Sequence, residues 1–179
     1  DSTRVAILLA AYEILVAGGF AAFTIEGVAA RAGAGKATIY RWWPSKGAFA
    51  VEAFMVAVVP RMDAMRESRS AMAHLRAQVH VAARIYRGRA GVLLRELLAL
   101  SQEDETTRRH LRRDFLEPRR RVGMASVRRA LESGELDRSV DPEVLADVLW
   151  GPIFHRLLVI YRPMDARSID RLLDIVLQG

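Results

Sequence analysis

The sequence predicts an all-α fold, and three observations carry this prediction. Apolar residues recur at intervals of three and four through most of the chain, which is the spacing of one helical face. The alternating pattern of a half-buried strand does not occur after residue 46, and Gly and Pro are sparse there. With 51% apolar and 27% charged residues over 179 positions, the composition is that of a globular protein and not of a disordered chain.

The first helix is expected from about Thr3 to Ala17. Gly18-Gly19 should end it, because glycine adopts the left-handed backbone that closes a helix. Glu13 and these glycines interrupt the apolar run, which is then too short to cross a membrane, so we expect a buried helix of a soluble protein. Its apolar face is formed by Ile7, Leu8, Ala11, Ile14 and Leu15.

The next segment predicts a helix-turn-helix. Thr24 can cap a helix over 25–32, and Gly33-Ala34-Gly35 is a turn of the kind that joins two short helices steeply. A third helix follows from Lys36 to Trp43, and Pro44 ends it. Ser45 can then cap a fourth helix, which places Lys46 in its first turn.

Helical segments continue to the end of the chain. Apolar stripes predict helices around 72–86 and 92–100, and a long polar helix is expected over 104–133 with a bend at Pro118. Gly134 opens a loop, and Asp141-Pro142 supplies a cap and a first-turn proline for a helix whose apolar face reaches Tyr161. A last helix is expected over 166–177.

In a helix-turn-helix the second helix enters the major groove, so small or polar residues should begin it. Gly35 and Ala37 leave that side uncluttered, and Lys46 adds a cation at a helix N-terminus, where backbone amides favour an anion. The candidate donors are Lys36, Thr38, Tyr40 and Arg41. The competing interpretations are solvated surface charges for the cations and core packing for Tyr40 and Trp42.

These residues resemble the N-terminal DNA-binding domain of the TetR family of transcriptional regulators. The resemblance covers residues 3 to 50 and rests on Arg4 with Ile7-Leu8, Gly19-Phe20, Thr24-Ile25, Val28-Ala29, Ala32-Gly33, the run from Lys36 to Arg41, and Pro44-Ser45-Lys46. It departs from the family at Gly35, where Ser or Thr is usual, and at Trp42, where His is common. The resemblance implies that Trp43 is a buried aromatic residue. The full set expected at DNA is Thr24, Gly35, Lys36, Ala37, Thr38, Tyr40, Arg41, Trp42 and Lys46.

The rest of the chain resembles the family more loosely, in the segments 95–104, 115–120 and 149–158. The resemblance implies a DNA-binding domain over residues 1–46 and a larger helical ligand-binding and dimerisation domain over 47–179. Residues expected at the ligand pocket are Leu75, Val79, Leu93, Leu97, Met124, Val127, Trp150, Phe154 and His155. Residues expected at a dimer interface are Leu149, Ile153, Leu157, Tyr161, Ile169, Leu172, Leu173 and Val176.

Enzymatic chemistry is not expected. The chain has no cysteine, its four histidines fit no compact metal-ligand spacing, and Gly35-Lys36 lacks the other residues of a phosphate-binding loop. No metal, cofactor or catalytic residue is therefore predicted. The arginines between Arg108 and Arg129 could form a second anion site, but acidic neighbours favour partial pairing.

The formal net charge of +6 is compatible with a polyanionic partner. Together with the resemblance, it leads us to expect a cytoplasmic, ligand-responsive repressor that binds a palindromic operator as a homodimer. A small, at least partly apolar molecule would release it from DNA, because the helices that would enclose this molecule are apolar. The alternatives are a helical small-molecule-binding protein or enzyme, an activator-type regulator, and an architectural protein that binds DNA without sequence preference.

Overall fold

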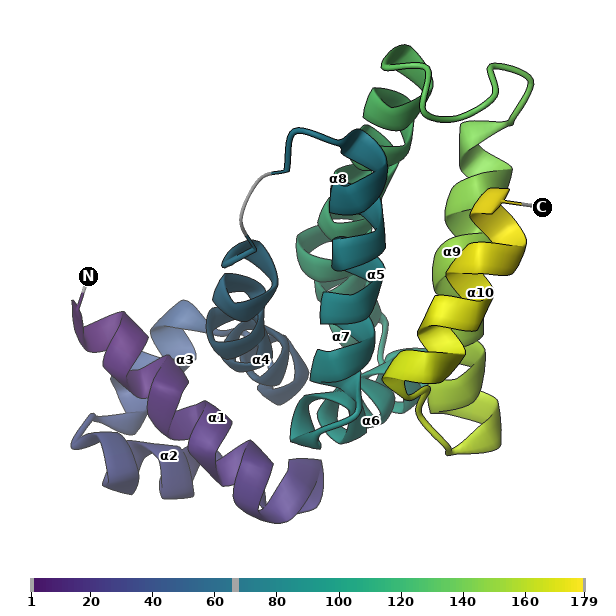
Figure 1. Cartoon of the computed structure of the whole chain (residues 1–179). Coiled ribbons are helices and arrows are strands. Elements are labelled where there is room, and N and C mark those ends of the chain that lie inside the picture. The colour runs from purple at the N-terminus through teal and green to yellow at the C-terminus, as the bar shows by residue number, and fades with distance from the viewer. Residues whose placement is uncertain (1, 66–67, 179) are drawn as a thin grey trace. The chain divides into compact units, whose positions relative to one another are not determined.

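The computed structural model describes residues 2–65 and 68–178, and the regular elements within those ranges are all helical (Figure 1). The all-α prediction is therefore confirmed. The chain divides into two compact units, one formed by residues up to 61 together with 89–116 and the other by 62–88 together with 117 onward. The elements are α1 (Ser2–Ala22), α2 (Ile25–Ala32), α3 (Lys36–Trp42), α4 (Lys46–Asp63), α5 (Ala71–Tyr86), α6 (Arg89–Glu103), α7 (Glu105–His110), η1 (Leu111–Leu116), α8 (Glu117–Glu132), α9 (Pro142–His155), η2 (Arg156–Ile160) and α10 (Ala166–Gln178).

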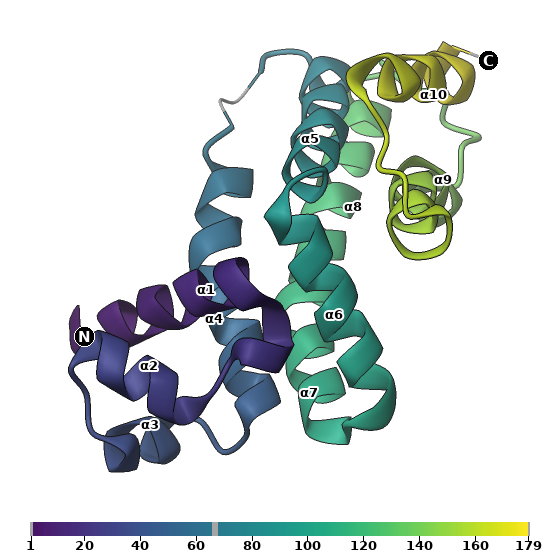
Figure 2. The same cartoon turned by 90° about the horizontal axis from the view of Figure 1, so that it is seen from below.

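In the first unit α1 packs against α2 and α6 (Figure 2). The helix is assigned through Ala22 but is broken at Gly19, whose φ of 69° confirms the predicted glycine stop. A carboxylate oxygen of Glu96 on α6 accepts a hydrogen bond from the Phe20 N–H at 2.8 Å. A Cβ at position 19 would lie 2.9 Å from the Glu96 carboxylate, so both the backbone angle and the close approach require glycine. Arg89, also on α6, donates from Nε to the Val16 carbonyl at 2.9 Å.

The length and apolar composition of α1 would allow it to cross a membrane. However, Ile7, Leu8, Ala11 and Leu15 are buried within the first unit, which is what the core helix of a folded domain shows. The predicted apolar face is thus the packing face, with Ile14 half-buried.

The next helices begin where their caps predict. Thr24 Oγ1 accepts from the Gly27 N–H at 3.0 Å at the start of α2, and Ser45 Oγ accepts from the Ala48 N–H at 3.1 Å at the start of α4. The third helix ends at Trp42, one residue before the predicted end, because Trp43 has an extended backbone (φ −126°, ψ 112°).

The prediction of one regular helix over 104–133 is wrong in the middle of that range. Residues 111–116 form a π-helical segment, η1, between α7 and α8. Pro118 lies in the first turn of α8 and has no N–H to donate to the Asp114 carbonyl, so the regular ladder is interrupted just before the proline and not at it.

The second unit is a helical bundle in which α5 packs on α8, α8 on α9, and α10 on both α5 and α9. Asp141 caps α9 by accepting from the Glu143 N–H at 2.8 Å, as predicted, and Gly134, where the loop opens, has a left-handed backbone (φ 73°). The fully buried side chains of this bundle include Leu75, Val79, Val127, Leu149, Ile169 and Leu173.

Glu135, in the loop after α8, caps the N-terminus of α5. Its carboxylate accepts hydrogen bonds from the Ser70 hydroxyl, from the Ala71 N–H at 2.7 Å and from the Met72 N–H at 3.2 Å. The Ser70 hydroxyl and these backbone N–H groups lower the pKa of Glu135 from 4.5 to about 2.

The pKa of Glu135 gives a pH-dependent stability. Because the folded-state pKa is depressed, the stabilisation is fully present above pH 4.5 and is lost as the pH falls toward 2. Replacement of Glu135 by Gln should lower the thermal midpoint at pH 7, and the difference from the original protein should shrink between pH 4.5 and 2. Thermal scans at several pH values measure this, with Glu132→Gln, an exposed acid of α8, as the control. A difference for Glu135→Gln that stays constant down to pH 2 would contradict it.

Candidate nucleic-acid interface

The turn between α2 and α3 is built on glycine. Gly33 has a left-handed backbone (φ 61°) and donates its N–H to the Ala29 carbonyl, which ends α2. Gly35 then begins α3, and its carbonyl accepts from the Thr38 N–H at 3.0 Å. A glycine cap costs only a few tenths of a kcal/mol relative to Ser, so α3 forms without a hydroxyl at its first position.

The two sides of α3 differ sharply in burial. Ile39 is fully buried, whereas Tyr40 is 59% exposed. The Tyr40 ring is therefore available to a partner and does not serve as core, which removes the core-packing alternative for this residue. The remaining predicted residues on and before this helix are exposed (Thr24, Gly35, Lys36, Ala37, Arg41) or half-buried (Thr38, Trp42).

Lys36 is paired with Glu26 across the turn, with 2.9 Å between Nζ and Oε1. The hydrogen bond from Lys36 lowers the pKa of Glu26, and the hydrogen bond to Glu26 raises the pKa of Lys36. Both side chains are more than half exposed, so the pair is weak, and a phosphate can replace the carboxylate at little cost.

Two further cations lie against aromatic rings. The Lys46 Nζ is 4.5 Å from the centroid of Phe20 and 6.0 Å from that of Phe23, so it lies beside the segment that leads into Thr24. The Arg41 guanidinium carbon is 5.7 Å from the centroid of Trp42. Such contacts order a long cationic side chain without neutralising it, which suits a phosphate contact.

Replacement of Lys46 by Ala should weaken binding to DNA and lower the slope of log affinity against log salt by about one, because each phosphate contact releases about one counterion. Fluorescence anisotropy on one duplex at several salt concentrations measures this slope. Arg84→Ala removes the same charge from an exposed position on α5 and should leave the slope unchanged. An unaltered slope for Lys46→Ala would argue against a phosphate contact.

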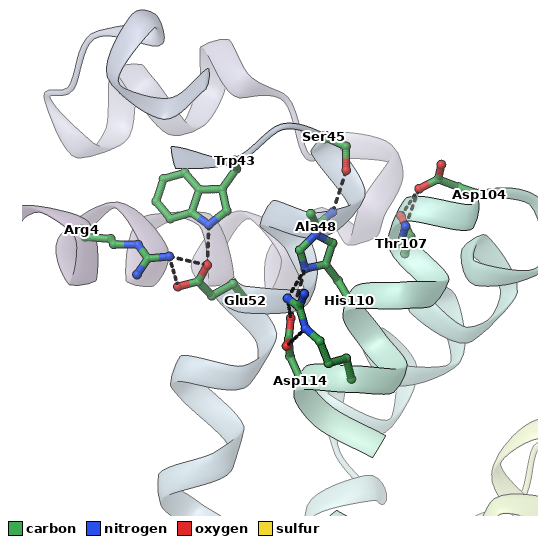
Figure 3. Close-up of polar contacts among 10 residues, drawn as sticks. Arg4, Trp43, Ser45, Ala48, Glu52, Asp104, Thr107, His110 and Asp114 are labelled. Atoms are coloured by element: carbon green, nitrogen blue, oxygen red, sulfur yellow. Dashed lines mark hydrogen bonds and ion pairs between the residues drawn. The ribbon is translucent and has the colours of Figure 1, made fainter. Parts of the chain in front are cut away.

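A polar network behind α3 was not predicted from the sequence (Figure 3). Trp43, only 3% exposed, donates from Nε1 to Glu52 Oε2 at 2.6 Å. Arg4 reaches both oxygens of the same carboxylate, at 2.8 Å each. The available signal was a lone Glu in the apolar run of α4, nine residues after a buried Trp whose N–H needs an acceptor.

The exposed, cation-bearing helix on a glycine turn defines a DNA-binding protein of the helix-turn-helix class. The family models for "Bacterial regulatory proteins, tetR family" and "Tetracyclin repressor-like, C-terminal domain" match residues 7–53 and 65–176. The chain belongs to the TetR family of bacterial transcriptional regulators. This confirms both the resemblance and the predicted architecture, while a boundary after residue 46 stays a prediction.

Several relatives resemble the chain over most of its length. It is 35% identical over 159 residues to the HTH-type transcriptional regulator YdeS of Bacillus subtilis, covering 89% of this chain and 80% of that protein. It is 31% identical over 176 residues to the DNA-binding transcriptional repressor TetR of Mycobacteroides abscessus, covering 98% and 92%. The crystal structure of the TetR family transcription regulator SCO0332 is 34% identical, with a TM-score of 0.85, covering 100% and 98%.

The residues predicted to line a ligand pocket are divided between the two units. Leu93 and Leu97 are buried in the first unit, on α6. The others belong to the second unit, in which Leu75, Val79, Met124 and Val127 are buried, Trp150 and Phe154 are half-buried, and His155 is exposed.

Within the second unit two of the predicted pocket residues have defined neighbours. The Trp150 indole lies so close to Gly123 that a Cβ there would be 3.0 Å from it, and the Phe154 ring is 6.0 Å from that of Tyr86. Burial raises the pKa of Tyr86, so its hydroxyl stays neutral at physiological pH. A pocket formed by the predicted residues remains a prediction.

The residues predicted at a dimer interface are mostly interior. Five of them are buried within the protomer, namely Leu149, Ile153, Leu157, Ile169 and Leu173, and an interface formed by the predicted residues remains a prediction. Leu172 and Val176 are half-buried, and Tyr161 is 66% exposed. The apolar side chains that the same elements do expose are Val144, Val148, Val159, Ile160 and Ile175.

The arginine cluster is largely engaged by neighbouring acids, as the composition of the segment indicated. Arg119 pairs with Asp63 at 2.7 Å, Arg113 with Asp114 at 2.6 Å, and Arg120 with both Glu143 and Asp147. The Arg113 hydrogen bond holds the pKa of Asp114 below its usual range. These pairs favour a structural role for the cluster over a second nucleic-acid site.

Proposed function

We propose that the protein is a cytoplasmic, ligand-responsive transcriptional repressor that binds a palindromic operator as a homodimer. The observation that carries the proposal is the exposed side of α3, where Tyr40, Lys36 and Arg41 face solvent while Ile39 anchors the helix in the core. The relative from Mycobacteroides abscessus is named as a repressor, which favours repression over activation.

The DNA contacts proposed are of two kinds. Lys36, Arg41 and Lys46 supply cations for phosphates, and Thr24 and Trp42 supply further donors. The contacts to base edges come from Tyr40 and Thr38, and the small residues Gly35 and Ala37 leave room for the bases to approach. Two such helices in a symmetric dimer would meet half-sites about 34–36 Å apart, one helical turn of DNA.

Dimerisation is proposed through the exposed apolar side chains of α9, η2 and α10. Val144, Val148 and Ile175 are 59%, 41% and 74% exposed, and a soluble protein rarely leaves such a group uncovered. A symmetric pairing buries the same patch on both copies and fixes the separation of the two recognition helices.

The effector is proposed to be a small molecule that is at least partly apolar and binds among the helices of the C-terminal region. Its binding would favour a conformer in which the two recognition helices no longer match the operator. Such coupling is reciprocal, so the operator must weaken effector binding by the same factor. A structure of FadR from Bacillus subtilis in complex with stearoyl-CoA has a similar fold, with a TM-score of 0.74 at 17% identity.

Selection of duplexes from a random DNA pool tests the proposal. The purified protein should enrich an inverted repeat with half-sites about one turn apart, and its affinity for the winners should fall steeply with salt. Enrichment of a single half-site would contradict the homodimer. Retention of DNA without sequence enrichment would indicate an architectural binder, and failure to retain DNA at low salt would overturn the DNA-binding proposal.

A further inference from the structure

We infer that Glu52 is a positioning residue for sequence-specific DNA binding: its carboxylate ties the C-terminal end of the recognition helix α3 to α4 and, through Arg4, to α1. The inference rests on the proposed function and adds a specificity determinant that does not itself face DNA. Arg4 lies on α1, Glu52 lies on α4 and Trp43 directly follows α3, and Figure 3 shows the three side chains meeting.

The network fixes the Trp43 ring on several sides. Its Nε1 donates to Glu52 at 2.6 Å, and one ring face stacks on Phe49 with 4.3 Å between centroids and an interplanar angle of 23°. The Arg4 guanidinium carbon is 5.5 Å from the centroid of the Trp43 ring, so the cation that pairs with Glu52 also contacts the indole.

The fixed indole determines how α3 ends. The backbone N–H of Trp43 donates to the Ile39 carbonyl at 2.9 Å, which closes the last turn of the helix. Trp42, one of the residues proposed to contact DNA, lies edge-on to Trp43, with 5.6 Å between centroids and an interplanar angle of 87°. A shift of Trp43 would therefore move both the helix end and the Trp42 side chain.

The hydrogen bonds of Glu52 with Arg4 and Trp43 fix the orientation of the indole more than they add to the free energy of unfolding. The side chains of Arg4 and Glu52 are 44% and 31% exposed, so solvent screens much of their attraction. The indole N–H, in contrast, belongs to a residue that is 3% exposed, and a buried donor without an acceptor is costly. Glu52 therefore selects the one indole orientation that satisfies this donor.

Positioning and simple electrostatics predict opposite effects when the charge is removed. Loss of an acid from a DNA-binding domain reduces repulsion of phosphates, so electrostatics alone would strengthen binding to every duplex. Loss of a positioning group would weaken binding to the preferred duplex and leave the number of phosphate contacts unchanged.

The test compares Glu52→Leu with Glu13→Leu. Glu13 is an acid of the same unit that pairs with Arg31 at the surface and has no contact to Trp43 among those described, so the two variants lose the same charge. For each, dissociation constants are measured on the selected operator and on a scrambled duplex over a range of salt concentrations. Glu52→Leu is expected to lose roughly tenfold in the operator-to-scrambled ratio, a loss comparable to one mismatched base pair, with an unchanged salt slope. Glu13→Leu should keep the ratio.

Two further variants, Glu52→Gln and Trp43→Phe, test the same contact and keep the inference testable if Glu52→Leu does not fold. Glu52→Gln keeps an acceptor for the indole and should retain most of the operator-to-scrambled ratio. Trp43→Phe removes the donor, so this ratio should fall as it does in Glu52→Leu. Glu52→Leu in the Trp43→Phe background should then add little, because the contact is already absent. Full retention of the ratio by both Glu52→Leu and Trp43→Phe would overturn the inference.

A second measurement does not depend on DNA. Amide hydrogen exchange of residues 39–43 should be faster in Glu52→Leu than in Glu13→Leu, because the end of α3 loses its anchor. Equal exchange rates in the two variants would overturn the inference even if no duplex were enriched. Failure of the wild-type protein to bind DNA would instead contradict the proposed function, so the two failures are distinguishable.

Discussion

Replacement of Phe49 by alanine is expected to lower the free energy of unfolding by about 3–5 kcal/mol, the usual cost of deleting a fully buried aromatic ring. Phe49 is fully buried, and its ring centroid is 4.3 Å from that of Trp43 and 5.3 Å from that of Phe23. The lost ring would leave a cavity between the start of α4 and the end of α3, so the recognition helix would lose its aromatic support as well.

Denaturant titration followed by far-UV circular dichroism measures the effect on Phe49→Ala. Phe49→Leu is the matched control, because it keeps much of the volume and should cost less than half as much. Operator affinity should fall with stability for Phe49→Ala. If the free energy of unfolding fell by less than about 1 kcal/mol, neighbouring side chains would have refilled the site. That result would contradict the expectation from the close stacking around the ring.

Replacement of Gly47 by alanine is expected to cost about 1–3 kcal/mol for a different reason, overpacking. Gly47 is in the first turn of α4, and a Cβ there would lie 3.0 Å from the Thr107 Cβ and overlap the Thr107 hydroxyl. Thr107 is fully buried, and both its hydroxyl and its N–H donate to Asp104, which caps α7. If the hydroxyl turns away, it loses its hydrogen bond to Asp104, and only the N–H of Thr107 still donates to that carboxylate.

Thr107→Ala in the Gly47→Ala background should recover part of the loss, because the overlapping hydroxyl is gone. Chemical denaturation of the two single variants and the double variant measures this coupling. The double variant should be less destabilised than the sum of the two single ones. Strict additivity would indicate that α4 and α7 separate freely and that the close contact contributes nothing.

Helix starts were predictable because their causes are local. Thr24, Ser45 and Asp141 each cap the helix that follows them, and an acceptor at the right spacing can be recognised in the sequence. The stop at Gly19 was predictable for a similar reason, although the close approach of Glu96 to that glycine was not. The π segment at 111–116 has no comparable signal before Pro118.

Long-range relations were harder to predict. Periodicity identifies the apolar face of a helix but not what covers it. Leu149 and Leu173 are predicted at a subunit interface, and the structure shows that both are buried within the protomer. The exposed apolar residues of the same elements, such as Ile175, lie off the predicted stripe. An interface residue and a core residue have the same sequence signal when both are Leu on one face.

The candidate site was partly predictable. The exposure of Tyr40 and the burial of Ile39 follow from helical geometry and the position of the turn. The role of Glu52 could not be derived, because its partners are 9 and 48 positions away along the chain and on different elements. Only the three-dimensional arrangement shows that one carboxylate serves both.

The two contacts from α6 to the end of α1 have a mechanical consequence. Arg89 holds the Val16 carbonyl and Glu96 holds the Phe20 N–H, two points about one helical turn apart at the hinge formed by Gly19. The two hydrogen bonds therefore connect α6 to α1 on both sides of Gly19. A movement of α6 is expected to carry α1 with it and not to be taken up by bending at Gly19.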